Sequence, residues 1–185
     1  MKKSFPTKPD TDPNTTLDRL RVALDAVGVR RRLLPVTDSP VSLSDLAATL
    51  RIAESDIVVP VILEAEGDYL TILASGSARL ALSQVSDLVG AQRVRTPGPR
   101  SVRKWLGKLL GLPGAPPDSP ALNWWEVPFI TGLPTVVDRA LLSREFVYAP
   151  VGDAGWIMRI GPDEMRRATS AVVGDVTGRK TRPRE

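Results

Sequence analysis

The apolar run at residues 57–63, in the stretch DIVVPVIL, is the feature that most restricts how this chain can fold. It has the length of a strand and is far shorter than the roughly 20 apolar residues needed to cross a bilayer. A turn at residues 65–68 separates it from a second apolar run. The pattern therefore predicts two antiparallel strands, over residues 57–64 and 69–74. Pro60 takes one backbone N–H donor out of the first strand.

Short helices and further strands alternate along the rest of the chain. Helical spacing predicts one helix, with Leu17, Leu20, Leu24 and Val27 on its apolar face, that Gly28 ends. Ser42 with Asp45 predicts a capping box at the start of a second helix. The strand expected at residues 29–36 has one apolar-leaning and one basic-leaning face. Other strands are predicted at residues 91–95, 135–138, 145–149, 156–160 and 171–176, and other helices at 83–90, at 101–110 and from 162 onward.

This alternation, in a chain of 185 residues with 42% apolar and 25% charged residues, predicts a single domain of the α/β class (mixed α+β). We expect a central, mostly antiparallel, curved sheet surrounded by short helices. Residues 1–14 are interpreted as a flexible arm, 15–177 as the domain and 178–185 as a basic tail. A Pro/Gly-rich insertion is expected near residues 111–122.

The chain contains neither cysteine nor histidine. Disulfides, thiolate nucleophiles, imidazole bases and Cys/His zinc sites are therefore excluded. The sequence has no phosphate-binding glycine loop and no calcium-loop spacing, so no metal and no cofactor is expected. Any catalysis has to come from carboxylates, lysines, hydroxyls, backbone groups or the substrate itself.

Basic residues are unevenly distributed in this chain of net charge +4. Six of them fall between residues 93 and 108, and the next acid along the sequence is Asp118. Such a cluster suits a polyanion such as tRNA, although a solvated helix face is the commoner explanation. The residues expected to bind tRNA are Arg93, Arg95, Arg100, Arg103, Lys104 and Lys108.

Several motifs together resemble the YbaK/prolyl-tRNA-synthetase-associated domain family. They are the strand DIVVPVIL, the segment PFITGLPTVVD at residues 128–138, GDAG at residues 152–155 and the closing AVVGDV at residues 171–176. The resemblance implies that family's fold and an aminoacyl-tRNA deacylase, which removes wrongly attached amino acids and so protects translation fidelity.

The same resemblance implies that the active site diverges. Val59 stands where the family has a substrate-holding lysine, and Pro60 stands where it has threonine. Trp125 or its neighbour replaces a glycine of the loop that approaches the substrate. The pocket residues that the resemblance implies are Val59, Pro60, Arg79, Trp125, Pro128, Phe129, Gly152, Asp153 and Gly155, and no catalytic residue is assigned among them.

Individual residues keep alternative interpretations. Trp124 and Trp125 are expected to pack, with base stacking left open. Arg79 is either a phosphate contact or an ordinary surface arginine. Asp138 is expected to cap the turn that follows it. Asp153 and Glu126 are the carboxylates near the expected pocket that could act as a general base.

Three functions remain open from the sequence. The first is a cytoplasmic editing domain that hydrolyses mischarged aminoacyl-tRNA or binds the tRNA acceptor end. The second is a catalytically silent relative that serves as a binding or regulatory module. The third is a protein that binds a peptide or small molecule in the same groove. No membrane association is expected.

Overall fold

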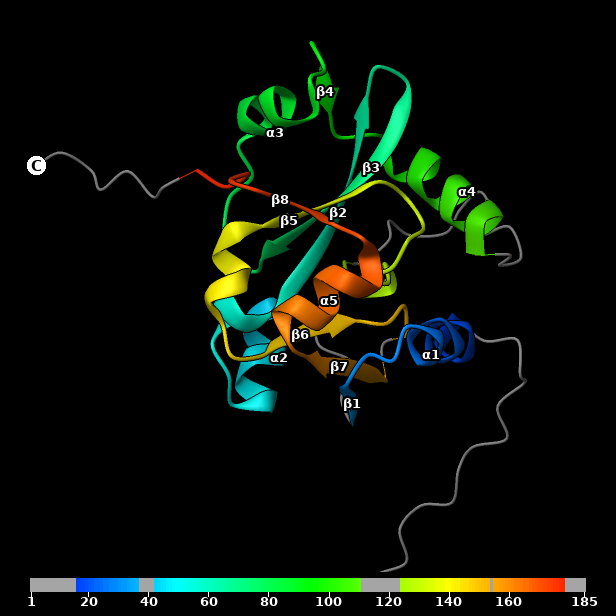
Figure 1. Ribbon diagram of the computed structural model, residues 1–185, viewed down its shortest axis with the longest axis vertical. Helices are drawn as coiled ribbons and strands as arrows, with labels where there is room; N and C mark the ends of the chain where they lie inside the picture. Colours follow the sequence, from blue (N-terminus) through cyan, green and yellow to red (C-terminus); the bar gives the residue numbers. More distant parts are fainter. Residues whose placement is uncertain (1–15, 37–41, 111–123, 154, 179–185) are drawn as a thin grey trace, which may run out of the picture.

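The computed structural model describes residues 16–36, 42–110, 124–153 and 155–178. Figure 1 shows two sheets, with short helices around them. The predicted α/β class is confirmed. The single expected sheet is divided into two, which an isolated parallel bridge between Ile57 and Tyr148 connects.

The larger sheet has five strands in the order β4-β2-β3-β5-β8. The predicted antiparallel pair forms its centre, as β2 and β3. Glu66 and Gly67 join these two strands with φ values of 54° and 96°, the paired positive φ of a tight hairpin turn. β5 and β8 then add in parallel to β3. The strands are β2 (Val58–Ala65), β3 (Asp68–Ser75), β4 (Val94–Arg95), β5 (Thr135–Asp138) and β8 (Val172–Gly174).

The smaller sheet has three antiparallel strands in the order β1-β7-β6. They are β1 (Arg31–Pro35), β6 (Val147–Pro150) and β7 (Trp156–Ile160). The Leu33 position pairs with the fully buried Met158, and that pair faces the main core. Because side chains alternate along a strand, Leu34 lies on the other face, where it packs toward Leu46.

Five α-helices and three short 3₁₀ turns surround the sheets in the described part of the chain. The N-cap half of the predicted capping box is confirmed at Ser42, whose Oγ accepts the Asp45 N–H at 3.1 Å, while the Asp45 carboxylate accepts from the Ser42 hydroxyl at 2.9 Å. Gly28 and Gly90 have the positive φ expected after a helix. The elements are α1 (Thr16–Ala26), α2 (Leu43–Leu50), α3 (Leu82–Val89), α4 (Pro99–Leu110), α5 (Pro162–Thr169), η1 (Glu54–Asp56), η2 (Trp124–Glu126) and η3 (Arg139–Ser143).

Two local expectations were wrong. Val27 was placed on the buried face of the first helix, but α1 ends at Ala26 and leaves Val27 50% exposed. Asp138 does not cap η3 with its side chain. Its buried carboxylate instead accepts hydrogen bonds from the Thr177 hydroxyl at 3.0 Å and the Val176 N–H at 3.5 Å. The terminal segment supplies these donors, so local sequence could not reveal them.

Some strands are shorter than predicted, because only part of each predicted segment lies beside another strand with which it can pair. The strand at residues 91–95 is reduced to Val94–Arg95, and the one at 171–176 to Val172–Gly174. The Pro/Gly-rich insertion expected near residues 111–122 lies outside the described residues.

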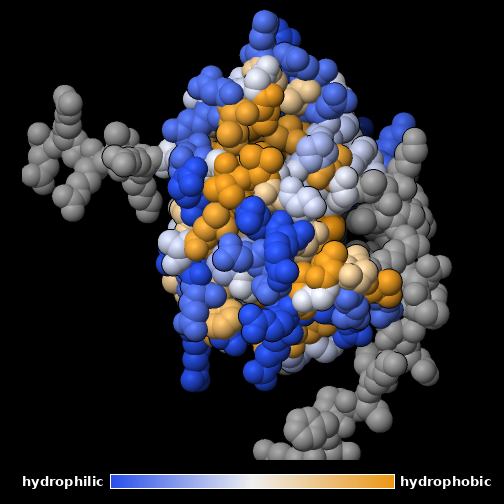
Figure 2. Space-filling view, in the orientation of Figure 1, coloured by the Kyte–Doolittle hydropathy of each residue, from blue (hydrophilic) through white to orange (hydrophobic). Residues whose placement is uncertain are grey.

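Exposed apolar side chains gather on part of the surface. Figure 2 shows them over the end of α3 and over β5 and β8. They border a groove of about 550 Å³ between the β2–β3 hairpin and the start of β8. No helix in the described ranges is long and apolar enough to span a membrane. The exposed apolar residues in this area are Leu82, Leu88, Val89 and Val172.

Candidate functional site

The segment from Trp124 to Phe129 contacts both faces of β2. Trp124 packs against the cluster that contains Ile57. Val127 is clustered with Ile62 on the opposite face of the strand. Phe129 is fully buried in the main core, together with Leu73 of β3. The expected packing role of the tryptophans is consistent with this arrangement.

Val59 and Pro60 point to opposite faces of β2, as neighbours on a strand must. Val59 pairs with Ala74. By the alternation of the strand it lies on the same face as Ile57, the residue whose cluster includes Trp124. Pro60 pairs with Leu73, and Leu73 packs with Phe129 in the main core, so Pro60 lies on the face of the sheet that Phe129 covers. Val59 is half-buried and Pro60 is buried. Ala74, the partner of Val59, packs in the cluster of Leu63, Ile72 and Val85, and Val59 is not among the residues that line the pocket formed by the tryptophans.

The turn at residues 152–155 is held close to the same loop. Gly152 has a φ of 79°, which favours glycine. The Asp153 carboxylate accepts the Gly155 N–H at 2.8 Å, and the Gly155 carbonyl accepts the Val36 N–H at 2.8 Å. The Phe129 N–H donates to the carbonyl of Pro150 at 3.0 Å, which fixes the loop beside the start of the turn.

A small pocket forms where these segments meet. Its volume is about 10 Å³, near the minimum that one water molecule needs. The indole rings of Trp124 and Trp125 meet edge to face, with centroids 5.5 Å apart, and both line it. We call this the tryptophan pocket. Its lining consists of Val36, Leu46, Trp124, Trp125, Pro150, Asp153, Trp156 and Ile157.

The chemical groups of the tryptophan pocket are few. Asp153 supplies its carboxylate and the rest of the lining is apolar. The side chain of Glu126, the second carboxylate considered, lies outside the described residues. Sequence reasoning did not identify Val36, Leu46 or Trp156 as lining residues. Only the position of Trp156 directly after the glycine turn could have indicated it.

Arg79 is exposed and does not line the tryptophan pocket. Its carbonyl accepts the Gly178 N–H at 3.0 Å, next to the bridge between Leu80 and Thr177. Pro128 is buried. Of the nine expected pocket residues, Trp125 and Asp153 line the tryptophan pocket, and the other seven are not among its lining residues.

The expected tRNA-binding residues lie on β4, just before it and on α4. Arg93, Arg100 and Lys104 are exposed, whereas Arg103 is half-buried. The side chain of Lys108 lies outside the described residues. α4 rests on Ile62 and Val127 through Val102 and Trp105, with the Trp105 and Tyr69 rings 5.7 Å apart.

Arg95 has an acidic partner that the sequence analysis missed. β2 places Glu64 directly opposite it, and the two side chains form an ion pair at 2.6 Å. The hydrogen bond that Arg95 donates to the Glu64 carboxylate, followed by the Coulomb attraction of that carboxylate, raises the pKa of the Arg95 guanidinium above its ordinary value. Arg95 is therefore charged but already partly neutralised, unlike its neighbour Arg93.

No group of three or more acidic, histidine or cysteine side chains that could hold a metal occurs within the described ranges. The polar groups available at the tryptophan pocket are the Asp153 carboxylate and backbone groups.

Comparison with known proteins identifies the fold. Two solved structures superpose over nearly their whole lengths. One is provisionally described as a trans-editing enzyme for prolyl tRNA synthetase, with 24% identity, a TM-score of 0.70, and coverage of 91% of this chain and 99% of the other. The second is the hypothetical protein APE2540, with 28% identity, a TM-score of 0.72, and coverage of 86% and 99%.

The search of curated proteins found no match. The family model described as the aminoacyl-tRNA editing domain, however, matches residues 39–177. That range contains every lining residue of the tryptophan pocket except Val36, and every strand except β1. The chain belongs to the aminoacyl-tRNA editing domain family.

Proposed function

We propose that this domain hydrolyses the ester bond of mischarged aminoacyl-tRNA, with the amino acid held in the tryptophan pocket. The family match over residues 39–177 carries the proposal, because it contains β2, the loop after η2 and the turn at Asp153. We take residues 15–177 as the editing unit and the cytoplasm as its location. Residues 1–14 and 178–185 are then extensions of it.

The chemistry needs few side chains. An aminoacyl ester is already reactive, so orientation and stabilisation of the oxyanion supply much of the acceleration. Asp153 is the general base for the attacking water in this proposal. The backbone between Val127 and Ile130 supplies donors near the ester carbonyl, and a neighbouring ribose hydroxyl can assist.

The pocket has to open before substrate enters. A volume of about 10 Å³ accommodates no amino acid side chain, so an indole ring has to move. Trp125 is half-buried and lies in the short turn η2, so it has room to rotate outward. The apolar walls then favour small, uncharged side chains on the substrate.

Because Val59 stands at the position of the family lysine, no cation from that position can hold the substrate. We propose that exposed basic groups outside the pocket hold the acceptor end instead. Arg93, Arg100 and Lys104 are suitable, because each is exposed and close to the hairpin that extends from β2. Arg79 is a further candidate on a separate part of the surface.

The test is direct. Purified protein is incubated with tRNAs charged with alanine, cysteine, serine or proline, and ester release is compared with a protein-free blank. We expect release from at least one charged tRNA, and loss of most of that release in Asp153→Asn. Salt-sensitive tRNA binding without hydrolysis would overturn the enzyme in favour of a silent binding module. Absence of both would leave the ligand-binding alternative.

A further inference from the structure

A second charged hollow lies at the junction of α1 and β1, away from the tryptophan pocket. Its volume is about 450 Å³. Three of its six lining residues are arginines, and Asp25 is the single carboxylate among the lining residues in the described chain. We call it the arginine hollow. It is lined by Arg21, Asp25, Val29, Arg30, Arg31 and Leu33.

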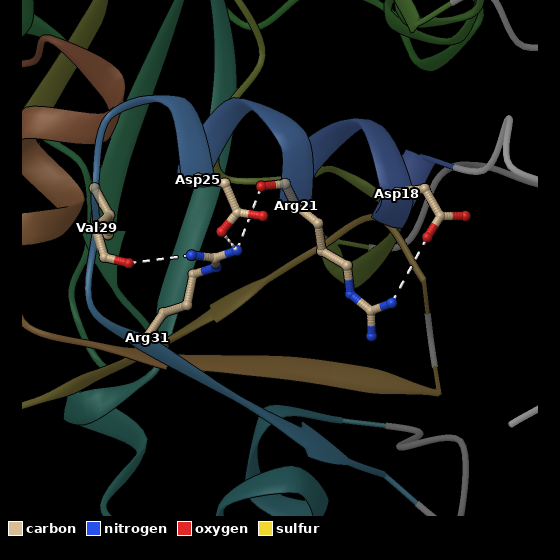
Figure 3. A network of polar contacts seen from close by, with 5 residues as sticks. All are labelled: Asp18, Arg21, Asp25, Val29 and Arg31. Carbon is tan, nitrogen blue, oxygen red and sulfur yellow. Dashed lines mark hydrogen bonds and ion pairs between the residues drawn. The ribbon is translucent and has the colours of Figure 1, made fainter. Parts of the chain in front are cut away.

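Arg31 is the fixed member of this group, as Figure 3 shows. Its guanidinium donates to the Val29 carbonyl at 3.1 Å, to the Arg21 carbonyl at 3.3 Å and to the Asp25 carboxylate at 2.6 Å. The Arg31 side chain is only 17% exposed. These bonds tie the start of β1 to α1 and hold one positive charge in place.

Arg21 and Arg30 are the members free to reach a ligand. The Arg21 side chain is 41% exposed and lies 3.6 Å from Asp18, its neighbour one helical turn away. The Arg30 side chain is 94% exposed, and its contact with Glu164 is long, at 3.8 Å. Glu164 also pairs with Arg167, so it is shared between two cations. Ion pairs of this length whose arginine is open to solvent are weak, so the guanidinium can turn to another anion.

We infer that the arginine hollow binds a backbone phosphate of the tRNA, outside the acceptor end. Arginine presents a planar fork of donors that matches phosphate oxygens, and Arg21 and Arg30 hold their carboxylate partners only at 3.6 and 3.8 Å. An RNA backbone fits better than an isolated anion, because the hollow is large and open. The inference rests on the proposed function for the identity of its ligand.

The positions of Arg31 and Val36 along the chain give the approximate distance between the arginine hollow and the tryptophan pocket. Arg31 begins the strand, and Val36, five residues later, lines the tryptophan pocket. At about 3.4 Å per residue this separation is about 17 Å, or roughly five nucleotides of a stacked strand. The two sites lie on opposite faces of β1, which is an edge strand of its sheet. A polyanion can therefore pass around its open side.

The experiment uses the full chain carrying Arg21→Gln and Arg30→Gln together, with Arg31 left in place. The matched control is Arg139→Gln with Arg144→Gln. These arginines are also exposed and paired with single carboxylates, at 3.2 and 3.3 Å, and their replacement removes the same charge. Binding of uncharged tRNA is measured at several salt concentrations for both double variants and for the unmodified protein.

We expect the slope of log K against log salt to become less steep by about 1 to 2 in the Arg21/Arg30 variant and to change little in the control. Affinity at 0.15 M salt should fall on the order of 10-fold in the Arg21/Arg30 variant. Equal slopes for the two double variants would overturn the inference. So would an acidic peptide that binds with the same sensitivity while tRNA binding is unaffected.

Substrate length provides a second measurement. The same variant should hydrolyse an aminoacylated CCA trinucleotide at the unmodified rate, because that substrate is too short to reach the hollow. It should lose on the order of 10-fold in kcat/KM on full-length aminoacyl-tRNA. Equal losses on both substrates would contradict the inference. If no substrate is hydrolysed, the proposed function fails, and the salt dependence of binding still decides the inference.

Discussion

The tryptophan pocket and the arginine hollow lie near opposite ends of β1 and are built in opposite ways. The pocket is small, apolar and held by backbone hydrogen bonds, with one carboxylate at its margin. The hollow is wide and charged, and its side chains reach solvent. Substitutions that alter packing should therefore act on the pocket, and substitutions that alter charge should act on the hollow.

The largest effect is expected from Phe129→Ala, which removes the fully buried ring behind the pocket. Loss of the ring and the remaining cavity should lower the free energy of unfolding by about 3 to 5 kcal/mol. Urea denaturation followed by circular dichroism measures this. Val22→Ala is the control, since Val22 is 70% exposed and its loss should cost under about 0.5 kcal/mol. Similar losses for the two variants would contradict the packing account.

Asp153→Asn should lower kcat for ester hydrolysis on the order of 100-fold, because a general base is lost while the shape of the side chain is kept. The asparagine carbonyl can still accept the Gly155 N–H, so the turn should persist. Single-turnover kinetics with a charged tRNA measures the change. A kcat within about threefold of the unmodified protein would exclude Asp153 as the base.

Val59→Lys tests whether restoring the lysine that the family has at this position is sufficient for efficient hydrolysis. On its own it should change hydrolysis less than about threefold, because Trp125 still lines the small pocket, while Val59→Lys with Trp125→Gly should raise kcat/KM by about 10-fold or more. Initial rates at limiting substrate measure both. Brisk hydrolysis by Val59→Lys alone would show that Trp125 does not obstruct the site.

The smallest effect concerns the hollow. Arg31→Gln should lower the free energy of unfolding by about 1 kcal/mol, because hydrogen bonds that join α1 to β1 are lost from a partly exposed group. Arg30→Gln, at the neighbouring and more exposed position, should change it by less than about 0.5 kcal/mol. Thermal unfolding in parallel distinguishes them, and equal changes would remove the structural role assigned to Arg31.

The sequence predicted those helices, turns and caps that depend on residues close together in the chain. The hairpin at Glu66–Gly67, the cap at Ser42 and the proline that begins α5 each depend on residues close in sequence. The resemblance to a known family was also confirmed. The expected pocket residues and the divergent active site stay predictions.

Contacts between distant segments could not be predicted in the same way. Glu64 neutralises Arg95 from 31 residues away, and Asp138 binds Thr177 across 39 residues. The arginine hollow was missed for the same reason. Arg30 and Arg32 were visible on the basic-leaning face of a predicted strand, but nothing in the sequence indicated that α1 would bring Arg21 beside Arg30 and Arg31.

The sequence by itself determined the secondary structure, the family and the absence of cysteine and histidine chemistry, because hydrophobic period, turn residues and composition are local properties of the chain. Tertiary structure alone decided which face of β2 carries Val59, that the tryptophans line one small pocket, and which cations retain accessible charge. Each of these depends on the distance between groups that only folding brings together, and electrostatic and packing energies depend on that distance.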